Sequence, residues 1–231
     1  MKDLRNTLES YLRSRIPGSR LERARPPLAP EIELHLINAD YPRDGLDPDQ
    51  VQALMDNPPY WAFCWASGQV LARHLLDSPE KIAGKTLVDF GAGSGVVGIA
   101  ARLAGAARVI LCDCDPLALD ACRLNARQCG VEVEYSSSLD DAIARAAGGI
   151  VTVADVFYDR DNLPLLTLLQ AQFAQVLVAD SRLKGEPLPG MATVASMASH
   201  TVPDLDESVE FNRVTVYEKL AVNSSQFTVD S

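Results

Sequence analysis

The spacing of apolar residues changes repeatedly along residues 86–180, and each change predicts a switch between strand and helix. Short apolar runs predict five strands, at residues 86–90, 108–113, 131–135, 150–156 and 175–180. Segments with apolar residues at helical spacing lie between them, at residues 95–104, 116–128, 140–147 and 163–174. Because strands and helices alternate, we expect an α/β fold with a doubly wound, mostly parallel sheet.

The end of the chain predicts how this sheet closes. Gly and Pro residues between positions 185 and 190 predict a loop that leads into residues 191–199, whose pattern leaves their structure open. We expect residues 201–202 to open a sixth strand and residues 212–220 to form the last one. Two strands without a strong helix between them predict an antiparallel hairpin, so the sheet should have seven strands and an antiparallel C-terminal strand.

The length of the chain suits one α/β domain preceded by an extension. Leu4, Leu8 and Leu12 recur at helical spacing, which predicts a short amphipathic helix. In a chain of 231 residues we expect a helical N-terminal extension over residues 1–57, an α/β domain over 58–220 and a polar tail over 221–231. No residues remain for the second, substrate-binding domain that an NAD dehydrogenase usually needs.

The protein is acidic, with a formal net charge of −10. Residues 1–25 hold seven Lys or Arg and three Asp or Glu, a net of +4, so the remainder carries −14. This balance argues against nucleic acid or an anionic membrane as a partner. The sequence shows no secretory apolar region and no apolar run long enough to span a bilayer, so we expect a cytoplasmic protein. Its oligomeric state is left open.

The five cysteines do not predict a metal site. Their odd number, without a signal peptide, indicates reduced thiols rather than a disulfide framework. No C-x-x-C pair occurs, and this argues against zinc. We therefore expect the cysteines to pack as small apolar side chains, and we expect no metal.

A glycine-rich turn follows the first predicted strand of the sheet and precedes its helix. Strand, glycine turn and helix in that order predict a cradle for a nucleotide or nucleoside. Gly91 allows the tight turn, and Gly93 lets a ligand approach the backbone without meeting a Cβ atom. The first turn of the helix then presents free N–H groups to the polar atoms of the ligand.

Two registers of this motif compete. Gly93-x-Gly95-x-x-Gly98 matches the dinucleotide fingerprint, whereas Asp89-x-Gly91-x-Gly93-x-Gly95 resembles motif I of the S-adenosylmethionine (AdoMet) methyltransferases. A carboxylate at Asp89 can anchor the cationic methionine end of AdoMet, directly or through water, but would repel a pyrophosphate. The motif therefore favours AdoMet over NAD.

Other residues around the cradle are candidates for contacts with this cofactor. Asp113 ends the second strand of the predicted sheet, where a carboxylate can accept hydrogen bonds from both ribose hydroxyls, while Asp115 suits the N-cap of the next helix. The adenine is expected against residues 137–139. Trp61 and Trp65 belong to a dense aromatic block, which predicts either a wall that covers the cofactor and its sulfonium or plain packing on the sheet.

A third segment, at the carboxyl end of the fourth strand, is a candidate for the acceptor site. In an open α/β sheet ligands bind beyond these strand ends. Asp155 could orient an attacking amine and balance the positive charge that develops on it, while Phe157 and Tyr158 could form an apolar channel. The alternative is an ordinary turn in which Asp159 caps the next helix.

These motifs together resemble the protein-lysine methyltransferases with a D-x-x-Y motif, methyltransferase family 16. The resemblance rests on the glycine motif that begins at Asp89, on the block with Trp61 and Trp65, and on Asp155-x-x-Tyr158. It covers most of residues 30–180 and is strongest to members that act on the electron-transfer flavoprotein β subunit. It implies a Rossmann-like methyltransferase fold over residues 58–220, AdoMet as the cofactor and N-methylation of lysine.

The resemblance also implies the methyl acceptor, a lysine side chain of a protein such as the electron-transfer flavoprotein β subunit. The family carries Gly-Asp-Pro-Gly-Arg after the fifth strand of the sheet, where residues 179–185 of this chain read Ala-Asp-Ser-Arg-Leu-Lys-Gly. This departure concerns the acceptor and not the cofactor. A ribosomal protein or a small, nicotinamide-like amine stays open as an acceptor, and a non-catalytic AdoMet-binding module is the alternative of a different class.

Overall fold

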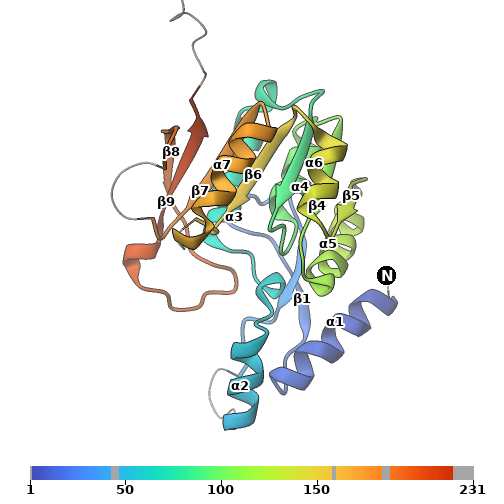
Figure 1. Ribbon diagram of the computed structural model, residues 1–231. Helices are drawn as coiled ribbons and strands as arrows, with labels where there is room; N and C mark the ends of the chain where they lie inside the picture. The colour runs from blue at the N-terminus through green and yellow to red at the C-terminus, as the bar shows by residue number, and fades with distance from the viewer. Residues whose placement is uncertain (1, 43–46, 158–159, 184–187, 221–231) are drawn as a thin grey trace, which may run out of the picture.

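A seven-stranded sheet forms the centre of the protein in the computed structural model, which describes residues 2–42, 47–157, 160–183 and 188–220 (Figure 1). Its strands, in chain order, are β3 (Thr86–Phe90), β4 (Arg108–Cys112), β5 (Glu134–Ser136), β6 (Ile150–Ala154), β7 (Gln175–Asp180), β8 (Met191–Ala198) and β9 (Arg213–Lys219). They lie in the order β5-β4-β3-β6-β7-β9-β8. The first five are parallel and β9 is antiparallel to β7 and β8, which confirms the predicted fold class.

Helices cover both faces of the sheet. They are α3 (Ala66–Asp77), α4 (Val96–Leu103), α5 (Pro116–Gln128), α6 (Leu139–Ala146) and α7 (Leu163–Gln172). Successive strand residues point to opposite faces, so Leu87 packs with α3 and α4 while Val88 packs with α6 and α7. Figure 1 shows α6 and α7 in front of the sheet. Two apolar cores, one on each face, therefore hold the strand ends in fixed positions.

The boundaries of α5 follow from local signals in the sequence. The Asp115 side chain caps the helix by accepting a hydrogen bond from Leu117 N at 2.8 Å, and Pro116 occupies the first helical position. Gly130 ends it with a φ of +67°. The predicted strand at 131–135 starts later, at Glu134, because Val131 N still bonds to Ala126 O of the helix at 3.0 Å.

The prediction for the end of the chain was partly wrong. Residues 191–198 form strand β8, whereas residues 201–202 form no strand of the sheet. Val202 instead makes an isolated bridge with Cys64, with hydrogen bonds of 2.8 and 2.9 Å in the two directions. Pro203 follows and lacks the N–H that a longer ladder would need. The antiparallel closing hairpin was predicted correctly, but its first strand lies about ten residues earlier than predicted.

The N-terminal extension is not purely helical. It contains α1 (Lys2–Arg15), β1 (Leu21–Ala24), β2 (Leu34–Ile37) and α2 (Pro48–Asp56), and β1 pairs with β2 in a small antiparallel sheet. Leu8 and Leu12 of α1 are buried in a third core cluster that includes Leu124 of α5. In Figure 1, β9 points away from the extension, so β7, antiparallel to β9, runs toward it. The extension therefore lies at the carboxyl end of the parallel strands.

Two further features of the described residues bear on function. None of their helices is long and apolar enough to cross a membrane. The part of the chain described here also brings no three His, Cys, Asp or Glu side chains together in a way that could hold a metal ion. The polar tail predicted at residues 221–231 lies outside the described residues.

Candidate active site

The glycine-rich turn forms an open backbone loop between β3 and α4. Gly91, Gly93 and Gly95 have φ angles of +70°, +51° and +81°, which residues other than glycine rarely adopt. The loop is anchored where the amides of Gly91 and Ala92 lie 2.9 and 3.2 Å from Cys112 O. A Cβ atom added to Gly93 would meet only Gly91 O, at 3.9 Å, so a ligand can approach the backbone there.

Asp113 lies against this loop, as predicted. Its Oδ2 accepts a hydrogen bond of 3.0 Å from Gly93 N, and its Oδ1 accepts one of 3.0 Å from Asp115 N. The side chain is half-buried, and burial raises the pKa of its carboxyl above the usual value. A carboxylate has about four acceptor sites, so both oxygens can still accept hydrogen bonds from a diol.

Asp89 lies beneath the loop and not on its surface. The side chain is 2 % exposed. Its Oδ2 accepts a hydrogen bond of 2.9 Å from Gly98 N, and its Oδ1 accepts one of 3.1 Å from Thr152 Oγ1. Burial raises the pKa of this carboxyl to about 7. Asp89 thus holds α4 to β6 under the loop, and its contact with the methionine end of AdoMet stays a prediction.

Gly98 has a structural role at the same place. A Cβ atom there would overlap Leu111 Cδ2, so only glycine lets α4 lie this close to β4 and donate to Asp89. The dinucleotide register of the motif includes this glycine. Its role in helix packing explains that match without a pyrophosphate.

The aromatic block packs as a unit beside the start of α3. Trp65 Nε1 donates a hydrogen bond of 2.9 Å to Tyr60 O, and the Trp65 ring lies 5.8 Å from the rings of both Tyr60 and Phe63. Trp61 is only 1 % exposed and packs against Tyr11 of α1 in the third core cluster. The packing role that we left open accounts for Trp61. Contacts of Trp61 and Trp65 with a cofactor stay predictions.

Asp155 follows β6 directly and has an unusual backbone. Its φ of +52° is in the left-handed region, which costs a residue other than glycine about 1–3 kcal/mol and is found most often at functional sites. A Cβ atom added to Gly91 would lie 3.7 Å from Cγ2 of Val156, the residue after Asp155. The segment after β6 therefore adjoins the glycine loop, as expected for an acceptor site beside a cofactor site.

Three groups hold the Asp155 carboxyl. Its Oδ1 accepts hydrogen bonds of 2.6 Å from Ser67 Oγ, 3.3 Å from Ser181 Oγ and 3.4 Å from Ser181 N. Burial raises the pKa of this carboxyl to about 6, and the nearby charge of Asp180 adds to the rise. The hydrogen bond from Ser67 and the charge of Arg182 lower it. At neutral pH Asp155 is therefore mostly ionised.

The other two predicted acceptor-site residues are Phe157 and Tyr158, and the structure describes only the first. Phe157 is fully buried in the core cluster that contains α6 and α7. Its side chain leaves no surface for an open channel in this arrangement, so its role toward the acceptor stays a prediction. Tyr158 lies outside the described residues.

Sequence reasoning missed two polar residues that connect these parts. Ser67 of α3 is buried and bonds to Asp155. Asn125 of α5 is also buried, accepts a hydrogen bond of 2.7 Å from His35 N and donates one of 2.9 Å to Ser94 O of the glycine loop. A polar residue on the apolar face of a predicted helix was the signal for Asn125, whereas no pattern pointed to Ser67.

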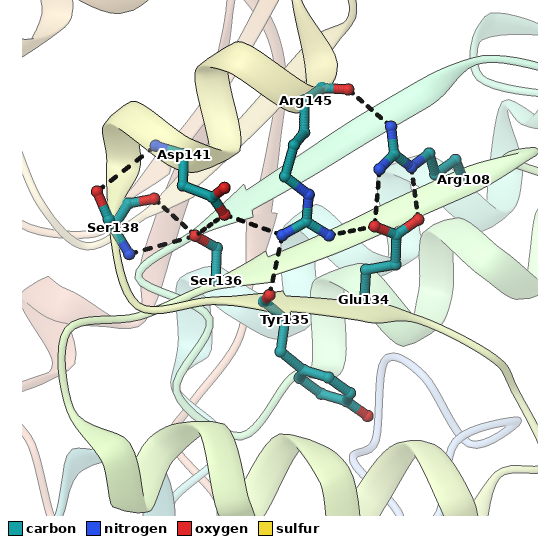
Figure 2. A network of polar contacts seen from close by, with 7 residues as sticks. All are labelled: Arg108, Glu134, Tyr135, Ser136, Ser138, Asp141 and Arg145. Carbon is teal, nitrogen blue, oxygen red and sulfur yellow. Dashed lines mark hydrogen bonds and ion pairs between the residues drawn. The ribbon is translucent and has the colours of Figure 1, made fainter.

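A network of charges fixes the segment after β5, where adenine is expected (Figure 2). Glu134 accepts hydrogen bonds of 2.5 and 2.7 Å from Arg108 and pairs with Arg145, which lowers the pKa of its carboxyl to about 2. Ser136 Oγ lies 2.7 Å from both Ser138 O and an Asp141 carboxylate oxygen. Ser138 also caps α6. The predicted adenine segment is therefore held at both ends, and its contact with adenine stays a prediction.

Comparisons with known proteins agree with this geometry. The model of the ribosomal protein L11 methyltransferase (PrmA) family matches residues 70–158. The chain is also similar to proteins named electron transfer flavoprotein beta subunit lysine methyltransferase. It is 32 % identical to the one from Xenopus laevis, over 77 % of this chain and 74 % of the relative. It is 36 % identical to the Caenorhabditis elegans homolog, over 66 % and 70 %. The match to the rat protein, at 34 % identity, covers 66 % of this chain and 61 % of the relative, so the chain spans less than two thirds of that protein.

Solved structures support the fold. A 16S rRNA N2 G1207 methyltransferase from Thermus thermophilus, in complex with AdoMet and guanosine, matches 87 % of this chain and 50 % of its own, with a TM-score of 0.54 and 16 % identity. A Streptococcus mutans chain assigned as a SAM-dependent methyltransferase matches 88 % of this chain and 56 % of its own, with a TM-score of 0.57 and 10 % identity. At such low identity these matches show a shared methyltransferase fold.

Proposed function

Because this chain belongs to the electron transfer flavoprotein beta subunit lysine methyltransferase family, we propose that it transfers a methyl group from AdoMet to a lysine side chain of a protein. The observation that carries the proposal is the position of two carboxylates. Asp113 follows β4 and accepts a hydrogen bond from the glycine loop, and Asp155 follows β6. Because β4 and β6 both pair in parallel with β3, the two carboxylates lie at the same end of the sheet. One carboxylate suits a ribose diol, and the other suits an amine.

The residues of the loop fit AdoMet as the methyl donor. The open backbone at Gly93 is a cradle that a side chain would fill, and Asp113 is placed to accept hydrogen bonds from ribose hydroxyls. Asp89 lies beneath the loop with its pKa raised to about 7 by burial, and its ionised form adds negative charge that favours a cationic methionine end over a pyrophosphate. When bound, AdoMet supplies an electrophilic methyl group. The T. thermophilus enzyme with the same fold, which is complexed with AdoMet, supports this choice.

Asp155 performs the central task on the acceptor side. Only the neutral form of a lysine amine is nucleophilic, and its ordinary pKa of about 10.4 keeps it protonated at neutral pH. The ammonium must first lose a proton to solvent. Asp155, ionised above about pH 6, then accepts a hydrogen bond from the neutral amine, orients it and balances the positive charge that develops on its nitrogen as it receives the methyl group. Ser67 holds the carboxylate in place for this task.

The acceptor that we favour is a lysine of the electron-transfer flavoprotein β subunit, because relatives named for that substrate cover most of this chain. A ribosomal protein lysine is the second candidate, supported by the PrmA match over residues 70–158. A small nicotinamide-like amine would need no protein-docking surface. Incubating the purified chain and labelled AdoMet with lysate of a strain that lacks it, followed by mass spectrometry, separates these acceptors. Label found only among small molecules would contradict methylation of a protein.

The alternative of another class is a module that binds AdoMet without catalysis. Asp155→Asn distinguishes it from an enzyme, since the amide keeps a hydrogen-bond acceptor for Ser67 but loses the charge. The enzyme should lose most of its turnover and keep its affinity for AdoMet. Turnover equal to that of wild type would remove Asp155 from the proposed chemistry.

A further inference from the structure

The helix α2 differs from an ordinary surface helix because none of its residues is buried. A helix on a globular protein usually packs an apolar stripe against the core. Here Val51 is 42 % exposed, Met55 is 72 % exposed, and Tyr60, shortly after the helix, is 59 % exposed. These are among the most exposed large apolar side chains of the described residues. Packing among the residues that the structure describes does not account for them.

The exposure does not come from a loosely attached segment. A capping box between Asp47 and Gln50, with hydrogen bonds of 2.8 and 2.9 Å, fixes the start of α2. Tyr11 Oη donates a hydrogen bond of 3.1 Å to Asn57 O just beyond its end. Leu54 is half-buried and packs against the third core cluster. The capping box fixes the shape of the helix start, while the contacts of Asn57 and Leu54 hold its C-terminal part to the protein, so Val51 and Met55 are exposed on a supported helix.

The charges of α2 are of one sign. The helix carries Asp49 and Asp56, with Asp47 as its N-cap, and its residues include no Lys or Arg. Asp56 lies in the last turn, where the helix dipole disfavours a carboxylate. Gln52, one turn earlier, donates a hydrogen bond of 2.7 Å to Asp56 and offsets this effect, so the carboxylate is held on the surface of the helix. An acidic surface with apolar side chains suits a basic chain that also offers apolar contacts.

The position of α2 links this surface to the acceptor site. The Tyr60 ring meets the Trp65 ring edge-on at 5.8 Å, and Trp65 is the N-cap residue of α3. Ser67, two residues further on, bonds to Asp155. Figure 1 shows α2 extending from the end of the molecule toward which the parallel strands run. The acceptor site and α2 therefore lie at the same end of the molecule.

We propose that Val51, Met55 and Tyr60, together with Asp49 and Asp56, form a docking surface, here called the α2 surface, for a cationic segment that flanks the methylated lysine of the acceptor protein. This inference rests on the proposed function, because it assumes a protein acceptor. The commitment to a cationic segment follows from charge complementarity, since the charged residues of α2 are all acidic. The α2 surface then determines which protein is methylated, while Asp155 acts on the amine.

Steady-state methylation of purified electron-transfer flavoprotein β subunit tests the α2 surface. The variants are Val51→Ser, Met55→Gln and Asp56→Asn, of which the last keeps an acceptor for the hydrogen bond of 2.7 Å from Gln52. Val194→Ser is the matched control, a valine that is also 42 % exposed but lies on β8, at the edge of the sheet. We expect the combined α2 variant to raise KM for the protein about tenfold, without a change in kcat or in AdoMet affinity, and the control to match wild type.

The outcomes separate the two proposals. If wild type methylates the subunit and the α2 variants keep its KM, the α2 surface is not a docking site, although the proposed function stands. If wild type neither binds nor methylates the subunit, the proposed acceptor fails and the docking proposal fails with it. Light scattering on wild type and variants measures the oligomeric state as well. A dimer that the α2 substitutions dissociate would assign the surface to a second copy of this chain and overturn the proposal.

Discussion

The Ser67 hydroxyl of α3 donates a hydrogen bond of 2.6 Å to Oδ1 of Asp155 beyond β6. The two residues are 88 positions apart in the chain, and they join the aromatic block to the candidate acceptor site. This contact favours the ionised form of a carboxyl that burial would otherwise keep neutral. The site proposed for lysine methylation thus depends on a serine that no motif includes.

Ser67→Ala should shift the pH dependence of methylation upward. Burial raises the pKa of Asp155 to about 6, and the hydrogen bond from Ser67 limits that rise. Without this bond the pKa of the carboxyl goes higher, and activity that needs the ionised form should appear only at higher pH. The measurement is kcat/KM for the acceptor protein from pH 5 to pH 9. Wild type should lose activity as the pH falls through about 6.

AdoMet affinity at pH 8 is the control for this variant, since the Ser67 hydroxyl bonds to Asp155 and, among the described residues, not to the glycine loop. If wild type and Ser67→Ala lose activity at the same acidic pH, a group other than Asp155 causes that loss.

Asp89→Asn should flatten the pH dependence of stability. The folded-state pKa of Asp89, raised to about 7 by burial, lies above its value in an unfolded chain, about 4. The folded protein therefore keeps a proton that the unfolded chain has lost, and this group makes the free energy of unfolding fall as pH rises from about 4 to about 7. An amide cannot ionise, so the variant lacks this fall. Urea unfolding at several pH values measures it, and equal slopes in both proteins would contradict the assignment.

Asn125→Ala should loosen the contact between the extension and the glycine loop. It would leave His35 N and Ser94 O without their partners at 2.7 and 2.9 Å. Each unpaired buried group costs about 1–3 kcal/mol. We expect faster amide exchange in β2 and weaker AdoMet binding, measured by hydrogen exchange and calorimetry. If Asn125→Ala shows faster amide exchange in β2 but unchanged AdoMet affinity, the hydrogen bonds of Asn125 do not affect the cofactor site.

Asp113→Asn should weaken AdoMet binding about 10- to 100-fold, which is the size expected for lost charge-assisted hydrogen bonds. The amide can still accept from Gly93 N or from Asp115 N, so the loop should keep its shape. Calorimetry with AdoMet and with NAD(H) checks the prediction. Binding of NAD(H) in preference to AdoMet would overturn the choice of cofactor.

The sequence predicted the elements whose signals are local. Asp115, Pro116 and Gly130 determine α5, and both of its observed ends were predicted. The edge strand β8 was missed, because its residues alternate between exposed and half-buried without a regular apolar pattern. Residues 201–202 were taken for a strand although their partner, Cys64, lies far away in the chain. The likeness to lysine methyltransferases was confirmed by relatives such as the Xenopus protein.

In the candidate site, too, the features with local sequence signals were predicted, and those that depend on distant contacts were not. The glycine loop and Asp113 lie together as predicted, because strand ends and the turn between them are a local pattern. For Trp61 the sequence left packing and cofactor contact open, because its burial depends on α1 packing over the aromatic block. Ser67 and Asn125 act across long separations in the chain, which no spacing rule detects. Tertiary contacts of this kind carry much of the support for the site.

The most direct test of the account is transfer of methyl groups to purified electron-transfer flavoprotein β subunit, followed by intact-mass and peptide mass spectrometry. The wild-type chain with AdoMet should add 14 Da increments, about the mass of one CH₂ each, on lysine residues, while Asp155→Asn should add almost none although it binds AdoMet. Calorimetry on both proteins provides the binding control. A subunit that keeps its mass with wild type, although AdoMet is bound, would contradict the proposed acceptor. Methylation by Asp155→Asn at the wild-type rate would contradict the proposed site.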